Sequence, residues 1–204
     1  MDEAPNWMAP RGKPWARGRS KPIYENAWIA VTEFQATAPT GALAAYGLVE
    51  FKNRALAILP IHADGSLELV GQHRFPIGDY SGEIPEGGGP HAEPPLEAAK
   101  RELREETGLG AASWQEILRM QLSNSVTDEL AVGYLALGLT QVDMFPQGDD
   151  TEEIARARRP FREVLDLVVA GKITDALTVA MMLRAYHMAK EGALPRDLAH
   201  AMLG

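Results

Sequence analysis

GGGPHAEPPLEAAKRELREETGL, residues 87–109, is the most informative stretch of this 204-residue sequence. Pro94 and Pro95 lack backbone N–H donors, and proline is well tolerated in the first turn of a helix. Gly108 can adopt the left-handed conformation that commonly ends a helix. The stretch therefore predicts a helix that begins at the two prolines and ends at Gly108.

One face of the predicted helix is acidic. Each residue of a helix advances about 100°, so Glu102, Glu105 and Glu106 fall within an arc of roughly 100°. Carboxylates that close repel one another and would weaken a helix that had only a structural role. Mg²⁺ and Mn²⁺ prefer oxygen ligands and often bridge carboxylates to phosphates, so the face is either a metal site or a solvated acidic surface. Arg101 can reach Glu105 and is expected to orient one of the glutamates.

Three glycines precede the helix. Residues 87–89 predict a turn in which backbone carbonyls can approach a bound ion, because glycine has no side chain to obstruct them. The carbonyl of Glu86 is the first candidate. We expect the whole Gly- and Pro-rich region 76–92 to be a loop.

Strand-like segments lie on both sides of this region. Ala55–Ile61 is a continuous apolar run, which is typical of a strand buried on both faces. Leu67–Phe75 follows after the turn-forming sequence at 63–66. Beyond the helix, Trp114–Leu122 and Glu129–Leu139 predict two more strands. The domain at 53–204 is therefore expected to contain a central sheet.

The C-terminal part of that domain is helical by its apolar spacing. Pro160 suits a first-turn position, and apolar residues recur at helical intervals as far as Val168. A second helix is expected over 173–188 and a short third over 195–203. Between the last strand and these helices, residues 146–153 form an acidic loop.

The N-terminal part divides into two segments. Residues 1–21 carry three prolines and five basic residues, and are expected to be an arm that is either poorly ordered or packed on a partner subunit. Residues 22–52 have strand-like texture and predict an antiparallel unit of two or three strands. Such a unit is marginal alone and must pack on something larger.

Composition excludes several classes of function. The formal net charge is −8, so a long polyanion such as nucleic acid is a poor ligand. The chain has no cysteine, which excludes disulfides, zinc–thiolate sites and thiol nucleophiles and suits a cytoplasmic protein. It has no apolar run long enough for a transmembrane helix, and the N-terminus does not resemble a signal peptide. An anionic small molecule remains a suitable substrate if metal supplies positive charge.

The order G-x5-E-x7-R-E-L-x-E-E-x-G-L in residues 87–109 resembles the Nudix box at every defining position. The resemblance implies an α/β fold, an α/β/α sandwich around a mixed sheet, here with an added N-terminal antiparallel unit. It implies that Glu102, Glu105 and Glu106 bind Mg²⁺ or Mn²⁺, with Glu86 contributing its main-chain oxygen and Glu93 supporting the site.

Three further segments resemble ADP-ribose and nucleotide-sugar pyrophosphatases of this superfamily. Residues 72–76 match their Q-x-R-x-P segment, residues 83–87 match E-x-P-x-G, and residues 171–176 match G-x-I-x-D-A. By this likeness Arg74 and Glu83 are candidates for binding substrate. The implied activity is hydrolysis of a nucleoside diphosphate linked to a second group, which yields a nucleoside monophosphate and a sugar phosphate.

One segment departs from that subgroup. ADP-ribose pyrophosphatases usually carry Ser-Pro-Gly after the strand beyond the box, whereas this chain has Ser123-Asn124-Ser125. The missing proline shifts weight from ADP-ribose itself toward another nucleoside diphosphate sugar. Rival possibilities are a hydrolase of free nucleotides, dinucleoside polyphosphates or a coenzyme, and a Nudix module that only senses its ligand.

Other site residues are left as alternatives. The general base is Glu105 or a glutamate of the acidic loop, Glu152 or Glu153, which could equally be solvated carboxylates. Aromatic side chains that could stack on a nucleobase, or instead pack in the core or an interface, are Tyr24, Trp28 and Phe75. Glu129 is a further candidate near the metal and substrate. The resemblance also implies a homodimer formed through the N-terminal strands.

Overall fold

In the computed structural model, which describes residues 5–142 and 153–204, the apolar run 55–61 lies in strand β4 (Asn53–Ile61). Its side chains alternate between two cores, because successive residues of a strand point to opposite faces. Leu56 and Ile58 belong to one core, whereas Leu59 and Ile61 belong to the other. The prediction that this strand is buried on both faces is therefore confirmed.

β4 is the central strand of a mixed sheet. The strand order is β10-β5-β4-β9-β8, with β6 paired to β5 and β7 paired to β4. β4 is parallel to β9, and the remaining pairs are antiparallel. The other strands of this sheet are β5 (Ser66–Arg74), β6 (Asp79–Glu83), β7 (Glu86–Pro90), β8 (Leu109–Gln121), β9 (Leu130–Gln141) and β10 (Ala155–Pro160).

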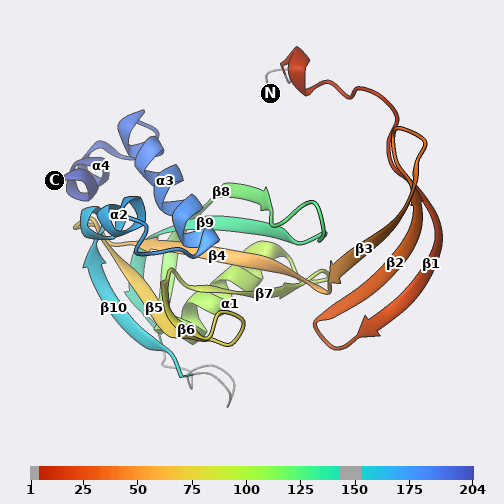
Figure 1. The fold of residues 1–204 in the computed structure, drawn as a ribbon. Helices are drawn as coiled ribbons and strands as arrows, with labels where there is room; N and C mark the ends of the chain where they lie inside the picture. Colours follow the sequence, from red (N-terminus) through yellow and green to blue (C-terminus); the bar gives the residue numbers. More distant parts are fainter. Residues whose placement is uncertain (1–4, 143–152) are drawn as a thin grey trace. The chain divides into compact units, whose positions relative to one another are not determined.

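Helices cover both faces of the sheet, as Figure 1 shows. The core that contains Leu56 is closed by α1 (Pro95–Thr107) through Ala98, Ala99 and Leu103. The opposite core is closed by three helices, α2 (Phe161–Val169), α3 (Ala176–Lys190) and α4 (Arg196–Leu203). This arrangement is the predicted α/β/α sandwich.

The remaining strands form a separate sheet of order β1-β2-β3. They are β1 (Ala16–Glu25), β2 (Ile29–Thr37) and β3 (Leu43–Phe51), preceded by a 3₁₀ turn at Asn6–Met8. The chain divides by its contacts into two compact units, Met1–Lys52 with Ser123–Asp128, and Asn53–Leu122 with Glu129–Gly204. The three-stranded sheet thus belongs to the first unit.

A short segment from the middle of the chain completes the first unit. The N–H of Val49 in β3 donates to the carbonyl of Val126 at 2.9 Å, and the N–H of Asp128 donates to Val49 at 3.3 Å. The Asp128 carboxylate accepts from the N–H of Phe51 at 2.9 Å. The segment 123–128, where the sequence departs from Ser-Pro-Gly, is therefore bound to the edge of β3.

Several elements differ from the sequence expectation. β1 begins at Ala16, inside the range 1–21 that was expected to be an arm. Pairing with β2 makes it a strand despite its basic side chains and Pro22. The region 76–92 contains β6 and β7 rather than only a loop, because partner strands fix its backbone. β10 was not predicted. No helix in the described ranges is long and apolar enough to span a bilayer.

Candidate active site

Helix α1 carries the acidic face and is bounded as the sequence predicts. Pro95 is its first residue, and Gly108 ends it in the left-handed region with φ of 70°. The N–H of Gly108 donates to the carbonyl of Arg104 at 2.9 Å. Leu103 has no exposed surface and anchors the helix on the sheet. The helix therefore presents its glutamates from a rigid base.

Two of these glutamates meet the start of β7. The N–H of Glu86 donates to Oε2 of Glu106 at 3.0 Å. Next to it, a side-chain carbon at Gly87 would overlap the carboxyl group of Glu102, so a larger residue there would require the Glu102 side chain to move. Glu106 is buried and the Glu102 side chain is 12% exposed. Residues 86–87 thus bring together two box carboxylates that lie a turn apart on α1.

Arg101 binds the acidic face. Its Nη1 donates to Oε1 of Glu102 at 2.8 Å and to Oε2 of Glu105 at 3.0 Å. Its Nη2 donates to the carbonyl of Gly88 at 3.1 Å and lies 3.5 Å from the carboxylate of Glu93. Burial opposes the guanidinium charge, but Glu102 and Glu105 outweigh it and raise the pKa of Arg101. One arginine therefore balances part of the repulsion that the sequence predicts.

The donor set fits a hard divalent ion. Among the described residues, no three carboxylates or imidazoles already stand together as a ready-made metal cluster. Glu102 and Glu105 are instead held by Arg101, and Glu106 by the Glu86 amide. Carboxylate oxygens beside a backbone segment are nonetheless the groups that Mg²⁺ and Mn²⁺ prefer. The donor chemistry therefore suits such an ion, and binding it would require these carboxylates to leave the partners that they have here.

Arg74 and Glu83, both expected at the substrate, are paired with each other. Nε of Arg74 lies 3.1 Å and 3.2 Å from the two carboxylate oxygens of Glu83, and Nη2 also binds Oε2. The Glu83 side chain is only 3% exposed, whereas that of Arg74 is 35% exposed. Hydrogen bonding to Glu83 raises the pKa of Arg74. Glu83 therefore holds a partly accessible guanidinium in one orientation.

The Glu86 side chain is partly buried and lies near α3. Burial raises its pKa well above the usual value, and the negative charge of Asp175 adds to this effect. The hydroxyl of Thr178 lies 3.4 Å from Glu86 Oε1. Sequence reasoning assigned only the main-chain oxygen of Glu86 and missed both contacts. The one sequence feature that pointed to this part of the chain was the segment 171–176, which leads into α3.

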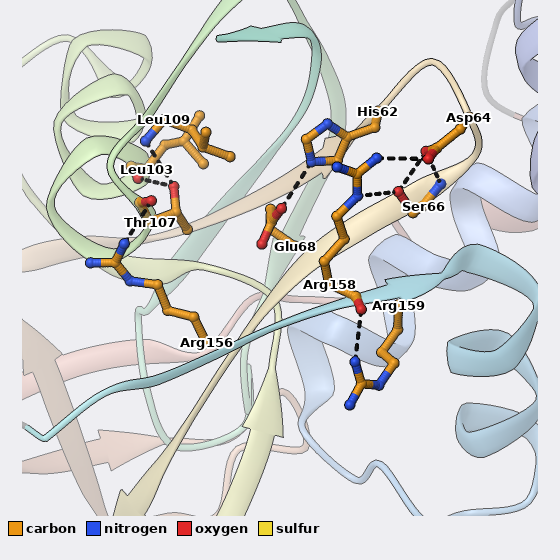
Figure 2. A network of polar contacts seen from close by, with 10 residues as sticks. All are labelled: His62, Asp64, Ser66, Glu68, Leu103, Thr107, Leu109, Arg156, Arg158 and Arg159. Atoms are coloured by element: carbon orange, nitrogen blue, oxygen red, sulfur yellow. Dashed lines mark hydrogen bonds and ion pairs between the residues drawn. The ribbon is translucent and has the colours of Figure 1, made fainter. Parts of the chain in front are cut away.

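The C-terminal end of α1 is bound by an arginine that the sequence analysis also missed. Nη1 of Arg156 in β10 donates to the carbonyl of Thr107 at 2.9 Å (Figure 2). A cation is favourable at this end of a helix because the free carbonyls carry partial negative charge. Arg156 therefore ties an outer strand of the sheet to the helix that carries the glutamates.

The remaining candidates lie in other parts of the sequence, and one of them lies outside the described residues. Tyr24 and Trp28 are exposed residues of the first unit, whereas Glu129 precedes β9 in the second. Glu153 is exposed, and Glu152 lies outside the described residues. Their assigned roles stay predictions.

Comparison with known proteins agrees with this geometry. The NUDIX domain profile matches residues 51–177. The ADP-ribose pyrophosphatase of Mycobacterium tuberculosis is 30% identical over 180 residues, which cover 88% of this chain and 86% of that protein. The ADP-ribose pyrophosphatase of Bacillus subtilis is 31% identical over 124 residues, 61% of this chain and 67% of that protein.

A solved structure gives the same fold. The crystal structure of an ADP compounds hydrolase matches with a TM-score of 0.79 and 20% identity, covering 90% of this chain and 98% of that one. At that identity the likeness concerns the fold alone. Together with the family profile and the box on α1, it shows that this chain belongs to the NUDIX domain family and is a Nudix hydrolase.

Proposed function

We propose that this hydrolase cleaves the diphosphate of a nucleoside diphosphate joined to a second group, either ADP-ribose or a nucleotide sugar. The observation that carries the proposal is the meeting of Glu102 and Glu106 at residues 86–87. A diphosphate resists attack by water chiefly because its oxygens are negative. A site that collects carboxylates next to a backbone segment supports a divalent ion that neutralises them.

Mg²⁺ or Mn²⁺ is the proposed ion. Glu102, Glu105 and Glu106 would hold it, with the main-chain oxygen of Glu86. When bound, such an ion neutralises phosphate oxygens, lowers the pKa of a coordinated water and stabilises the leaving phosphate. Arg101 keeps Glu102 and Glu105 in place through its two hydrogen bonds.

The reaction consumes one water. Its oxygen bonds to one phosphorus, the bond from that phosphorus to the bridging oxygen breaks, and the bridging oxygen leaves with the other phosphate. A carboxylate that accepts the water's proton completes the step. Glu105, Glu152 and Glu153 remain the candidates for this base. Arg74, held by Glu83, is proposed to bind the diphosphate or the distal sugar.

Two observations bear on the substrate. The relatives from M. tuberculosis and B. subtilis carry the name ADP-ribose pyrophosphatase, which supports ADP-ribose. Ser123-Asn124-Ser125, in place of Ser-Pro-Gly, favours a different nucleoside diphosphate sugar. Both substrates share the same scissile diphosphate, so the site at α1 serves either.

A substrate panel tests the proposal. With Mg²⁺ present, we expect ADP-ribose or GDP-mannose to yield a nucleoside monophosphate and a sugar phosphate. Glu106→Gln removes a metal ligand and should lower kcat by at least about a hundredfold. Glu97→Gln on the same helix is the matched control, because the Glu97 side chain is exposed and forms an ion pair with exposed Lys100. Much faster cleavage of oxidised nucleoside triphosphates than of both diphosphates would contradict the proposed substrate class.

We also propose that the enzyme is a homodimer that acts in the cytoplasm. In the described part of the first unit, Ala36 is the single buried residue, while Trp15, Tyr24 and Trp28 are exposed. Large exposed apolar surfaces commonly mark protein interfaces. A second copy of the chain, packed on the N-terminal sheet, would cover these aromatic side chains.

A further inference from the structure

The segment 171–176 has no part in the proposed chemistry, but it leads into α3 and includes the residue that caps this helix. Asp175 is the residue before α3, and its Oδ2 accepts a hydrogen bond from the N–H of Thr178 at 2.7 Å. A side-chain cap of this kind fixes where a helix starts. Thr178 is therefore set in the first turn of α3, where it has no exposed surface.

The hydroxyl of Thr178 contacts both residues that flank Pro85. Its oxygen accepts from the N–H of Ile84 at 3.0 Å. It can donate its own proton to Oε1 of Glu86, which lies 3.4 Å away. A hydroxyl has one proton and two lone pairs, so it can make both bonds at once. One side chain of α3 thus spans the turn that leads into β7.

Two other elements hold the same turn. The N–H of Ile58 in β4 donates to the carbonyl of Pro85 at 2.9 Å. The N–H of Glu86 donates to Glu106 on α1 at 3.0 Å. Since α1 and α3 cover opposite faces of the sheet, the turn at 84–86 is hydrogen-bonded to helices on both faces. Thr178 supplies the hydrogen bonds from α3.

No water can replace the Thr178 hydroxyl easily. Ile84 and Thr178 both have no exposed surface, so the N–H of Ile84 would lose its partner if the hydroxyl were removed. An unpaired buried N–H is strongly unfavourable, and the peptide would shift to find another acceptor. That shift would be passed through Pro85 to Glu86, the second residue along the chain.

We propose that Thr178 is a positioning residue that fixes the Glu86 peptide for metal binding, linking the capped start of α3 to the box helix. The inference rests on the proposed metal-binding role of Glu86 and Glu106. Thr178 itself touches neither the metal nor the substrate in this scheme. Its effect reaches the metal only through the turn at 84–86.

Two matched pairs of proteins test the inference, and within each pair one member lacks the hydroxyl. The first pair is wild type and Thr178→Val, and the second is Thr178→Ser and Thr178→Ala. The readouts are the Mg²⁺ concentration for half-maximal hydrolysis and the Mn²⁺ dissociation constant from electron paramagnetic resonance of the protein without substrate. If the valine variant does not fold, the serine and alanine pair decides the question.

The variants without the hydroxyl should raise both metal constants by about tenfold or more, as loss of a supporting contact commonly does. Thr178→Ser should stay within about twofold of wild type. Met188→Ala, at the other end of α3 and buried there, is the control for lost stability: it should lower Tm and leave the Mn²⁺ constant unchanged.

The outcomes separate the two proposals. Mn²⁺ binding that is equal with and without the hydroxyl, in a wild type that hydrolyses diphosphates, would overturn the role of Thr178 alone. A metal constant that rises equally in Met188→Ala would also overturn it, because lost stability would then explain the effect. A wild type that neither binds Mn²⁺ nor hydrolyses diphosphates would overturn the proposed function as well. Glu106→Gln marks the value expected when a ligand itself is lost.

Discussion

Gly87 lies where a neighbouring side chain, rather than its own backbone conformation, limits the size of the residue. Its φ is not in the left-handed region, so alanine would be tolerated by the chain itself. The obstacle is the carboxyl group of Glu102, which occupies the space that a side chain would need. The glycine therefore allows the Glu102 carboxylate, a proposed metal ligand, to lie directly against β7.

Gly87→Ala should consequently reduce activity without unfolding the protein. We expect kcat/KM to fall by at least about tenfold, because misplacing a catalytic group by about 1 Å can cost about a hundredfold. Gly82→Ala is the control, since a side-chain carbon there has no neighbour within 4 Å. Steady-state kinetics with Mg²⁺ and a thermal melt check the result. Full activity in Gly87→Ala would show that Glu102 is free to lie elsewhere.

For single residues, the sequence predicts which glutamates share one face of α1 but not the residues that contact them. Glu102, Glu105 and Glu106 follow from helical spacing, which acts within two turns. Thr178 lies far along the chain from Ile84 and Glu86, and no local pattern connects them. Such contacts arise only when the sheet has brought α3 and β7 together.

Among the elements, the β4–β5 hairpin carries a network of charged side chains. Asp64 in its turn accepts from the N–H of Ser66 at 3.0 Å and from Nη2 of Arg158 in β10 at 2.7 Å. Nε of Arg158 donates to the Ser66 hydroxyl, as Figure 2 shows. His62 and Glu68 form a further pair on this hairpin at 2.9 Å. The turn is thereby tied to the outer strand β10.

This network predicts a pH dependence of stability. Hydrogen bonds from Ser66, with the Arg158 charge, lower the pKa of Asp64 from 3.8 to about 2. A carboxylate whose pKa is depressed by folding stabilises the fold above its unfolded pKa and loses that effect as pH falls. The free energy of unfolding should therefore be higher in wild type than in Asp64→Asn at neutral pH.

The difference between these two proteins should shrink as pH falls from 3.8 to about 2, the interval between the two pKa values. Urea titrations at a series of pH values measure it. A difference that persists unchanged below pH 2 would mean that the Asp64 charge is not what stabilises the turn.

The elements also show where sequence reading stops. The ends of α1 are predictable because Pro95 and Gly108 determine them by their own backbone conformation, without partners distant in sequence. β7, with three successive glycines, has no strand pattern of its own and exists through pairing with β4. At Gly89 a side chain would crowd Leu56 and Ala98, so the close approach of α1 explains the glycine there. β1 was not predicted for the same reason as β7: its residues are exposed and basic, and it is a strand because its backbone pairs with β2.

For the whole molecule, the first prediction concerns its mass. A homodimer should sediment at twice the 22.2 kDa mass of the chain. Replacing exposed Trp28 by aspartate would place a charge in the proposed interface and should produce monomers. Lys172→Asp, a charge change in the second unit that lies outside the N-terminal sheet, is the control. Sedimentation of wild type as a monomer at micromolar concentration would contradict the homodimer.

The division into two units was anticipated only in part. The change from strand texture to the Nudix region near residue 52 follows from the sequence, and the contacts divide the chain at Lys52. The sequence does not predict that Ser123–Asp128 belongs to the first unit, because that segment lies between β8 and β9, two strands of the other unit. The hydrogen bond between Phe51 and Asp128 joins residues 77 positions apart.

Because Ser123–Asp128 is part of the first unit, this unit cannot be completed during synthesis until that segment has been made. Domains generally fold as units during synthesis, with the N-terminal one first. Here the N-terminal sheet is translated early but waits for Val126 and Asp128, which emerge only after β8. Until then β3 has an unpaired edge, the kind of edge that recruits other chains. The N-terminal sheet is therefore completed only after β8 has been made, although it precedes β8 in the sequence.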